Sequence, residues 1–180
     1  KDVRSYSLKE LRKKIGSALQ RPAIFKGTIR SNVHPLGEAD EERLSSAVDT
    51  AQARDVVNAK ENGYDSVLEQ NGRNLSGGQK QRISVARAIA KRPEVLILDD
   101  SSSALDNITD LKLRRAIKSL DYPVTTFIVS QRASSVLGAD KIIVMDEGGI
   151  VGMGTADELR KTCAVFREIE DSQSSSEARK

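Results

Sequence analysis

The stretch of sequence that decides the fold is Val95-Leu96-Ile97-Leu98-Asp99-Asp100-Ser101-Ser102-Ser103-Ala104-Leu105-Asp106. Its first four residues form an uninterrupted apolar run, which is typical of a buried strand of a parallel sheet. Asp99 and Asp100 follow at the carboxyl end of this strand, the edge where open α/β sheets bind their ligands. An acidic turn after a strand is common for a single Asp, but that explanation is weaker for the whole string. The stretch therefore predicts an α/β fold with a functional site at this edge.

A glycine-rich motif, Leu75-Ser76-Gly77-Gly78-Gln79, lies shortly before this strand. Ser76 and Gln79 have the spacing of a capping box, in which each side chain bonds to the backbone N–H of the other residue. A Ser hydroxyl and unshielded Gly amides at a helix start also form an anion site, because free N–H groups and the helix dipole favour phosphate. An isolated match favours the capping box alone, whereas the neighbouring strand and its carboxylates favour the anion site.

Short β-branched runs alternate with helices that begin at capping boxes along the rest of the chain. This alternation predicts a largely parallel sheet that is covered by helices and ends in a hairpin. The runs are residues 95–98, 125–129 and 142–145, the last joined through residues 146–149 to Ile150 and Val151, and the capping boxes pair Ser7 with Glu10, Ser76 with Gln79 and Thr155 with Glu158.

Helix-forming residues dominate residues 40–91, where no convincing strand appears beyond short loop pieces. We interpret this part as a helical insertion, a subdomain of about residues 30–92. A helix over residues 79–91 ends before Pro93, since proline cannot continue a helix.

A further helix is predicted over residues 108–120, and the chain is expected to end in a tail without regular structure. Residues 1–171 are interpreted as one partial domain, and the Ser-rich, charged residues 172–180 as a disordered tail. The predicted inward face of the helix consists of Ile108, Leu111, Ile117 and Leu120.

Composition excludes several classes of protein. With 38% hydrophobic and 31% charged residues, the 180-residue chain has the composition of a globular domain, and its apolar runs are far shorter than the roughly 20 residues that span a bilayer. The net charge of +3 is spread along the chain and only 3% of residues are aromatic, which argues against a nucleic-acid surface. The single cysteine, Cys163, excludes a disulfide framework and favours a reducing compartment.

In this context the sequence resembles the ABC ATPase family of transporters. Residues 75–79 match the signature loop of that family, residues 95–100 its Walker B strand and residues 103–106 its D-loop, in the right order and spacing. Upstream, residues 15–22 resemble the Q-loop, and Phe25-Lys26-Gly27-Thr28-Ile29-Arg30-Ser31-Asn32 resembles the phrase that follows it in exporter-type members. The resemblance covers residues 2 to about 170 and implies an ABC ATPase core of the P-loop NTPase type, with an inserted helical signature subdomain.

The resemblance implies that the ligands are ATP and Mg²⁺, with each ATP lying between the phosphate loop of one subunit and the signature loop of the other. Asp99 would hold Mg²⁺ through water, Gln20 would reach Mg²⁺ and the attacking water, and Asp106 would lie in the dimer seam. Residues 65–73 resemble the loop that touches transmembrane coupling helices, which implies a place at the cytoplasmic face of the membrane. The residues that meet the partner's nucleotide would be Ser76, Gly77, Gly78 and Gln79.

Three departures from the family pattern concern the chain's own nucleotide. No Gly-x₄-Gly-Lys-Ser/Thr phosphate loop (Walker A) occurs, so we expect the N-terminal strands and this loop to be missing and the chain alone to bind ATP weakly or not at all. Asp100 stands where the family has the Glu that orients or activates water, and Gln131 stands at the position of the switch histidine. Glutamine cannot carry positive charge toward a phosphate or exchange a proton near neutral pH.

These departures, beside an intact signature loop, lead to the hypothesis of one half of a heterodimeric exporter whose own site hydrolyses slowly. One alternative is a soluble ABC ATPase that acts on DNA or ribosomes; the phrase at residues 25–32 and the compact helical insertion argue against it. The other is a module that dimerises but never hydrolyses, against which the intact signature loop weighs.

Overall fold

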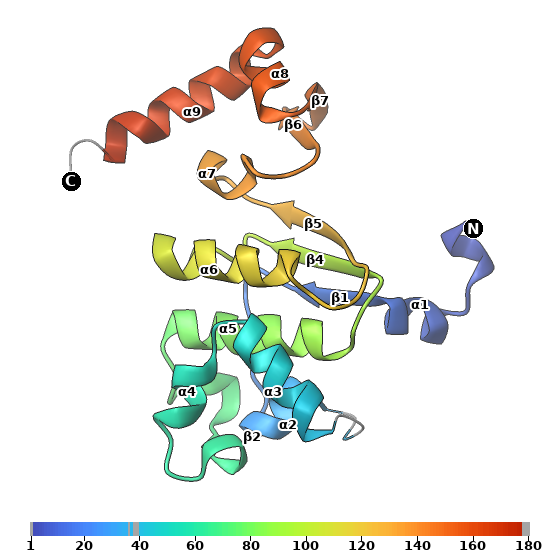
Figure 1. Cartoon of the computed structure of the whole chain (residues 1–180), viewed down its shortest axis with the longest axis vertical. Coiled ribbons are helices and arrows are strands. Elements are labelled where there is room, and N and C mark those ends of the chain that lie inside the picture. The colour runs from blue at the N-terminus through green and yellow to red at the C-terminus, as the bar shows by residue number, and fades with distance from the viewer. Residues whose placement is uncertain (1, 36, 38–39, 178–180) are drawn as a thin grey trace. The chain divides into compact units, whose positions relative to one another are not determined.

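The computed structural model describes residues 2–35, 37 and 40–177 (Figure 1). The chain forms two compact units, residues 1–129 and 130–180, and each is described by itself. The prediction of one domain over residues 1–171 stays a prediction.

The first unit is built on a parallel sheet of three strands in the order β1-β4-β5 (Figure 1). The strands are β1 (Ile15–Ala18), β4 (Val95–Asp99) and β5 (Thr125–Val129). The register aligns Ala18 of β1 with Leu98 of β4, and Leu98 with Ile128 of β5. The predicted β-branched runs at residues 95–98 and 125–129 are therefore confirmed as neighbouring parallel strands.

The two faces of this sheet differ in burial. One face packs into the core with Ala18, Leu96 and Leu98, and α5 (Gly77–Ala90) contacts β1 along it. The approach is so close that a Cβ on Gly16 would lie 2.4 Å from the carbonyl oxygen of Ala88. On the opposite face Phe127 is 55% exposed. Helix α5 thus covers one face of the sheet, and Phe127 on the other face is exposed.

Between β1 and β4 the unit is mainly helical. Apolar residues of these helices belong to the same hydrophobic core as the buried residues of the sheet, among them Leu44, Val48, Val56 and Ile83. The assignment of residues 30–92 as a separate subdomain stays a prediction, because α5 packs on β1 as well as on α2 and α3. The elements are β2 (Gly27–Thr28), α2 (Ile29–Val33), α3 (Glu41–Thr50), α4 (Arg54–Asn58), a 3-10 turn η2 (Gly63–Asp65), β3 (Val67–Leu68) paired with β2, and a 3-10 turn η3 (Gln70–Gly72).

Helix α6 (Asn107–Lys118) follows β4, and its inward face differs from the predicted one. Ile108 is 68% exposed and Leu111 is 42% exposed, whereas Leu113 and Ile117 are buried. Asp110 is also buried, and Arg114 forms an ion pair with it at 2.8 Å, which compensates the burial of the carboxylate. The core-facing stripe therefore runs through positions 110, 113 and 117, and the prediction for Ile108 and Leu111 is wrong.

All three predicted capping boxes are confirmed. Ser76 begins α5, Ser7 begins α1 (Leu8–Lys14), and Thr155 begins α8 (Ala156–Thr162). A fourth box, formed by Thr28 and Ser31 at the start of α2, was missed because its second residue is Ser rather than Glu or Gln. A 3-10 turn η1 (Val3–Ser5) precedes α1.

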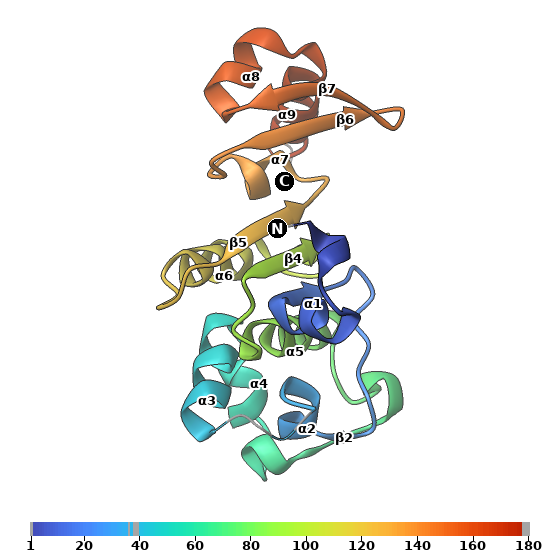
Figure 2. The same ribbon diagram turned by 90° about the vertical axis from the view of Figure 1, so that its right-hand side faces the viewer.

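The second unit contains an antiparallel hairpin of β6 (Ile142–Asp146) and β7 (Gly149–Gly154), as predicted, with α8 beside it (Figure 2). A short helix, α7 (Ala133–Val136), precedes the hairpin, and α9 (Ala164–Glu177) ends the unit. The core of this unit is formed by Ile142, Val144, Ala156, Leu159, Cys163 and Phe166. The buried Cys163 is a packing residue here, consistent with the absence of a disulfide framework.

The C-terminal segment departs from the prediction of a disordered tail over residues 172–180. Helix α9 continues through Glu177, so residues 172–177 are helical, and residues 178–180 lie outside the described residues. Gln173 helps to hold this end of α9 in place, because its side chain forms hydrogen bonds with the backbone of Gln131 and Ala133. Over the part of the chain that the structure describes, no helix combines the length and apolar character needed to cross a membrane.

Candidate functional site

The predicted carboxylates lie where β4 ends. Asp99 is the last residue of β4 and is partly buried, and Asp100 is the first residue of the following turn. Gln20 lies two residues beyond β1, the parallel neighbour of β4, so the two strands bring their carboxyl ends to one edge. The Nε2 atom of Gln20 donates to Oδ2 of Asp100 at 3.1 Å. Two residues that are 80 positions apart in the sequence are thus in direct contact.

The backbone of Asp100 is held in an unusual conformation. Its φ of 43° lies in the left-handed region, which Asp adopts more readily than most residues. Its N–H donates to the carbonyl of Val129 at 2.8 Å, and its own carbonyl accepts from Oγ of Ser103 at 2.8 Å. These bonds fix the direction in which β4 delivers the Asp100 side chain.

The start of α5 has the geometry that the glycine-rich motif predicts. The N–H of Gln79 donates to Oγ of Ser76 at 3.2 Å, and the N–H of Ser76 donates to Oε1 of Gln79 at 2.9 Å. Gly77 is exposed, and a Cβ placed on it would meet nothing within 4 Å. The helix start therefore presents its Gly77 backbone to solvent, as an anion site requires.

Gly78 joins this helix start to the turn after β4. A Cβ on Gly78 would lie 2.9 Å from the carbonyl oxygen of Ala104, so any side chain would force the two backbones apart. Residues 76–79 and the turn that ends at Asp106 are consequently neighbours. The structure thus brings together two of the predicted groups, the glycine-rich start and the D-loop.

Asp106 is exposed and caps the start of α6. Its carboxylate accepts from the backbone N–H of Thr109 at 2.9 Å and from Oγ1 of Thr109 at 2.7 Å. These hydrogen bonds, that of the hydroxyl first, lower the pKa of Asp106 below its ordinary value. The residue is therefore a structural cap in this chain, and its predicted place in a dimer seam stays a prediction.

Gln131 belongs to the second unit, whereas the other predicted site residues belong to the first. It is exposed, and its backbone carbonyl accepts from Nε2 of Gln173 at 2.6 Å. Its predicted role beside the same nucleotide as Asp100 stays a prediction.

Sequence reasoning missed two side chains of α5 that contact the segment around Gln20. Nε2 of Gln81 donates to the carbonyl of Leu19 at 3.2 Å, and Nη1 of Arg87 donates to the carbonyl of Ala23 at 2.7 Å. A signal was available for Gln81, because it is a polar residue at helical spacing from the buried Val85 and Ala88.

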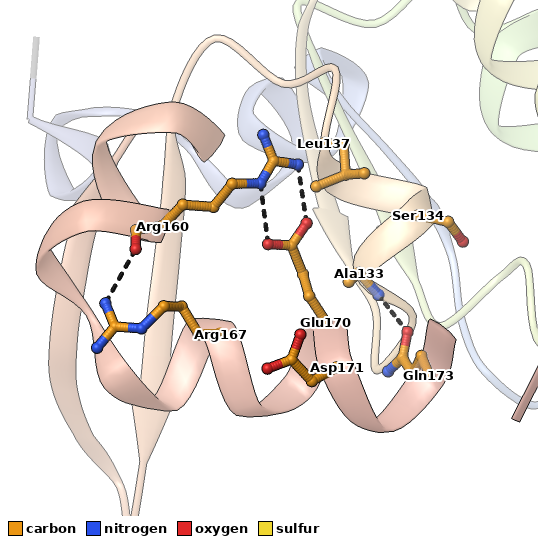
Figure 3. A pocket seen from close by; sticks show the side chains of 8 residues that line it. All are labelled: Ala133, Ser134, Leu137, Arg160, Arg167, Glu170, Asp171 and Gln173. Atoms are coloured by element: carbon orange, nitrogen blue, oxygen red, sulfur yellow. Dashed lines mark hydrogen bonds and ion pairs between the residues drawn. The ribbon is translucent and has the colours of Figure 1, made fainter. Parts of the chain in front are cut away.

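A pocket of about 520 Å³ lies in the second unit, among residues of α7, α8 and α9 (Figure 3). Arg160 forms a two-pronged ion pair with Glu170 at 3.0 and 2.8 Å, and Arg167 donates to the carbonyl of Arg160 (Figure 3). The ion pair raises the pKa of Arg160. Two basic and two acidic side chains line this pocket, Asp171 being the second acid, so their charges balance. None of the predicted site residues lines it.

A parallel sheet with carboxylates at its carboxyl edge and a glycine-rich helix start nearby defines an ATPase-type α/β core. A family model with the description "ABC transporter" matches residues 1–103 of this chain. The chain therefore belongs to the ABC transporter family. The match includes Gln20, the glycine-rich motif, Asp99 and Asp100.

Relatives and a solved structure agree with this membership. The uncharacterized ABC transporter ATP-binding protein YknU of Bacillus subtilis (strain 168) is 42% identical over 96% of this chain and 30% of its own length. The ATP-dependent lipid A-core flippase of Chromohalobacter salexigens is 39% identical over 88% of this chain and 28% of its own length.

The solved structure of a bacterial Atm1-family ABC exporter with ATP bound matches with a TM-score of 0.88 and 28% identity, covering 97% of this chain and 31% of that one. The chain thus spans about 30% of the length of each of these three proteins. The predicted fold class, an ABC ATPase core with a parallel sheet flanked by helices, is confirmed.

Proposed function

We propose that this chain is the ATP-binding part of an ABC exporter, and that it supplies its signature loop to the ATP of a partner subunit while its own site hydrolyses slowly. The observation that carries the proposal is the start of α5. Ser76 and Gln79 hold the helix start in a closed capping box, and the open space around Gly77 leaves room for a phosphate. The helix dipole adds partial positive charge at this point.

The chain's own site is weaker by the same reasoning. A carboxylate on Asp reaches about 1.5 Å less far than one on Glu, and a misplacement of about 1 Å can reduce a rate on the order of a hundredfold. In this chain the Asp100 carboxylate also accepts a hydrogen bond from Gln20, which orients it within the site. Gln131 cannot act as a cation near neutral pH. We infer that ATP at the chain's own site is hydrolysed slowly and stays bound for longer than ATP at the partner's site.

The ligands of the proposed site are ATP and Mg²⁺. Asp99, Asp100 and Gln20 offer the oxygen atoms that Mg²⁺ prefers, and Mg²⁺ is usually bound by one or two carboxylates together with phosphate oxygens. No group of three or more His, Cys, Asp or Glu in the described residues could hold a metal ion by itself. The donor set therefore fits an ion that arrives with its nucleotide, and such an ion would neutralise phosphate charge. Asp99 and Gln20 are the residues proposed to hold it.

The partners follow from the same proposal. The nucleotide of the signature loop belongs to a second ATP-binding domain, and the difference between the two sites favours a hetero-partner over an identical copy. The segment at residues 65–73 would meet transmembrane coupling helices, which puts the chain at the cytoplasmic face of a membrane. A phosphate loop, which this sequence does not contain, would have to come from elsewhere in the transporter before the chain's own ATP could bind.

The proposal is tested by Gly77→Asp in the full-length protein, assembled with its partner half-transporter. A Cβ at this position meets nothing within 4 Å, and a carboxylate at a helix start interacts favourably with the helix dipole, so we expect the fold to be retained. The charge of the new carboxylate would repel the partner-held phosphate, and ATP hydrolysis by the assembly should fall by on the order of a hundredfold. Gly77→Asn is the matched control, because it has the same size without the charge and should retain much more activity.

Asp100→Asn in the same assembly completes the test. It removes the carboxylate of the site that is proposed to be slow, so total hydrolysis should change little. If instead Asp100→Asn abolishes hydrolysis while Gly77→Asp leaves it intact, the roles of the two sites are reversed and the proposal is wrong. If both variants leave ATP hydrolysis intact, neither site residue of this chain takes part in hydrolysis. That result contradicts the proposal and favours the alternative of a module that dimerises but does not itself hydrolyse ATP.

A further inference from the structure

Helix α6, drawn in yellow in Figure 1, has an outward face as well as the face that packs into the core. The core-facing positions are 110, 113 and 117. The outward face is formed by residues at spacings of i, i+3, i+4 and i+7, which share one side of a helix. These residues, all exposed, are Ile108, Leu111, Lys112 and Arg115, and we call them the α6 surface.

The apolar part of the α6 surface is a pair of large side chains. Ile108 is 68% exposed and Leu111 is 42% exposed. A single exposed apolar residue is common on protein surfaces, but residues at i and i+3 are neighbours on a helix and together form a patch. Covering such a pair removes apolar area from water, which is the main favourable contribution to most protein associations. The pair is therefore suited to anchor the apolar side of a docked segment.

The basic part of the α6 surface lies directly beside this pair. Lys112 and Arg115 are also three positions apart, so their positive charges are close together. Neither side chain forms an ion pair with any residue that the structure describes. A partner that brings carboxylates would relieve the repulsion between the two cations, and Arg115 can bind a carboxylate through two parallel hydrogen bonds. The charge of the surface therefore selects an acidic partner.

A pocket adjoins the basic part of the α6 surface. It has a volume of about 340 Å³, and Lys112 and Thr109 line it from α6. The other charged side chains of its lining are two ion pairs at 2.6 Å, Arg54 with Asp49 and Arg82 with Asp55. Each of these pairs is balanced in charge, so Lys112 contributes the positive charge that the lining leaves uncompensated. The pocket offers room for a carboxylate that pairs with Lys112.

We propose that the α6 surface docks an acidic, amphipathic helical segment of a partner protein. Apolar side chains of that segment cover Ile108 and Leu111, and its carboxylates pair with Lys112 and Arg115. An amphipathic helix is commonly bound along its apolar face in this way, with charges beside the anchors that select the partner. The docking needs no nucleotide and goes beyond the proposed function.

An anionic membrane fits the same surface less well. The side chains of Asp49 and Asp55 are 55% and 63% exposed, and they line the pocket together with Lys112. A flat anionic surface would meet these carboxylates as well as the cations, and like charges repel each other. A narrow helical segment can contact the α6 surface alone. The charge pattern therefore favours a protein partner.

Fluorescence anisotropy with the full-length protein tests the docking. The probe is a labelled helical peptide of leucine and glutamate with all its leucines on one face, and a peptide of the same composition in scrambled order is the comparison. The unaltered protein should bind the first peptide more tightly than the second. Lys112→Glu with Arg115→Glu should raise the Kd of the first peptide by at least about tenfold and remove its salt dependence. Ile108→Ser with Leu111→Ser should raise that Kd by on the order of tenfold.

The chain offers a matched control for each double variant. Lys9→Glu with Arg12→Glu reverses the same two residue types at the same spacing on the exposed side of α1. Ile143→Ser with Ile150→Ser removes two apolar side chains of the hairpin that are 49% and 60% exposed. Both controls should leave the Kd unchanged. Melting temperatures of all variants separate lost folding from lost docking.

Four outcomes would overturn the inference. The first is that neither peptide binds, and the second is that the controls weaken binding as much as the changes on α6 do. The third is that phosphatidylglycerol vesicles bind through the α6 surface and the leucine–glutamate peptide does not. The fourth is that the changes on α6 break the assembly with a second ATP-binding domain, since that domain would then already cover the surface. Because the binding assay contains no ATP, its result does not depend on the proposed function.

Discussion

The start of α5 and the end of β4 are neighbours in this chain, and they differ in how completely each carries the chemistry expected of it. At the start of α5, the capping box is closed and the space beside Gly77 is open. At the end of β4, Asp100 carries a shorter side chain than the family's Glu, and it is bonded to Gln20. Under the proposed function, this difference means that the chain keeps the loop it presents to a partner, while the site that it uses itself is weakened.

The largest expected effect would come from repairing the weaker region. Asp100→Glu together with Gln131→His in the full-length heterodimer should raise ATP turnover at the chain's own site, by up to about a hundredfold if reach is the limiting factor. The measurement is steady-state hydrolysis with Gly77→Asp present, which suppresses the partner's site. Unchanged turnover would count against a weakened site at the end of β4. Asp100→Glu alone is the control that separates reach from the contribution of the histidine.

Sequence reasoning was accurate where one local rule decides the structure. The apolar run before Asp99 and the spacing of Ser76 to Gln79 each determine an element without outside help, and both are confirmed. It failed at α6, where Leu111 and Leu113 are chemically identical and only the core selects between them. The burial of Asp110 could not be foreseen either, because it depends on the ion pair with Arg114.

The contacts around Gln20 show the same limit in the candidate site. Gln20 itself was predicted from its motif, but the bonds from Gln81 and Arg87 to its segment join residues more than 60 positions apart. Such pairings depend on how α5 packs on β1, which no local pattern encodes. Gln131 belongs to the second unit, and its proposed role still rests on the resemblance alone.

A smaller effect is expected from a side chain placed at the contact between the start of α5 and the turn after β4. Gly78→Ala would bring a Cβ to 2.9 Å from the carbonyl oxygen of Ala104 and should lower the free energy of unfolding by about 1–3 kcal/mol. Gly77→Ala is its matched control, since it meets nothing within 4 Å and should be neutral or stabilising by about 0.5–1 kcal/mol. Urea unfolding measures both. Equal losses would mean that the start of α5 is not packed against the turn after β4.

The smallest expected effect concerns the cap at Asp106, at the end of that turn. Hydrogen bonds from Thr109 lower the pKa of this carboxylate in the folded chain, so its contribution to stability is present above the unfolded pKa and is lost as the pH falls through the folded one. Asp106→Asn keeps an oxygen that can accept the backbone N–H of Thr109 but does not titrate. The unaltered chain should therefore be more stable than the variant at pH 7, and that difference should shrink as the pH falls below about 4. Thermal melting at both pH values measures it, and a difference independent of pH would show that the charge of Asp106 does not stabilise α6.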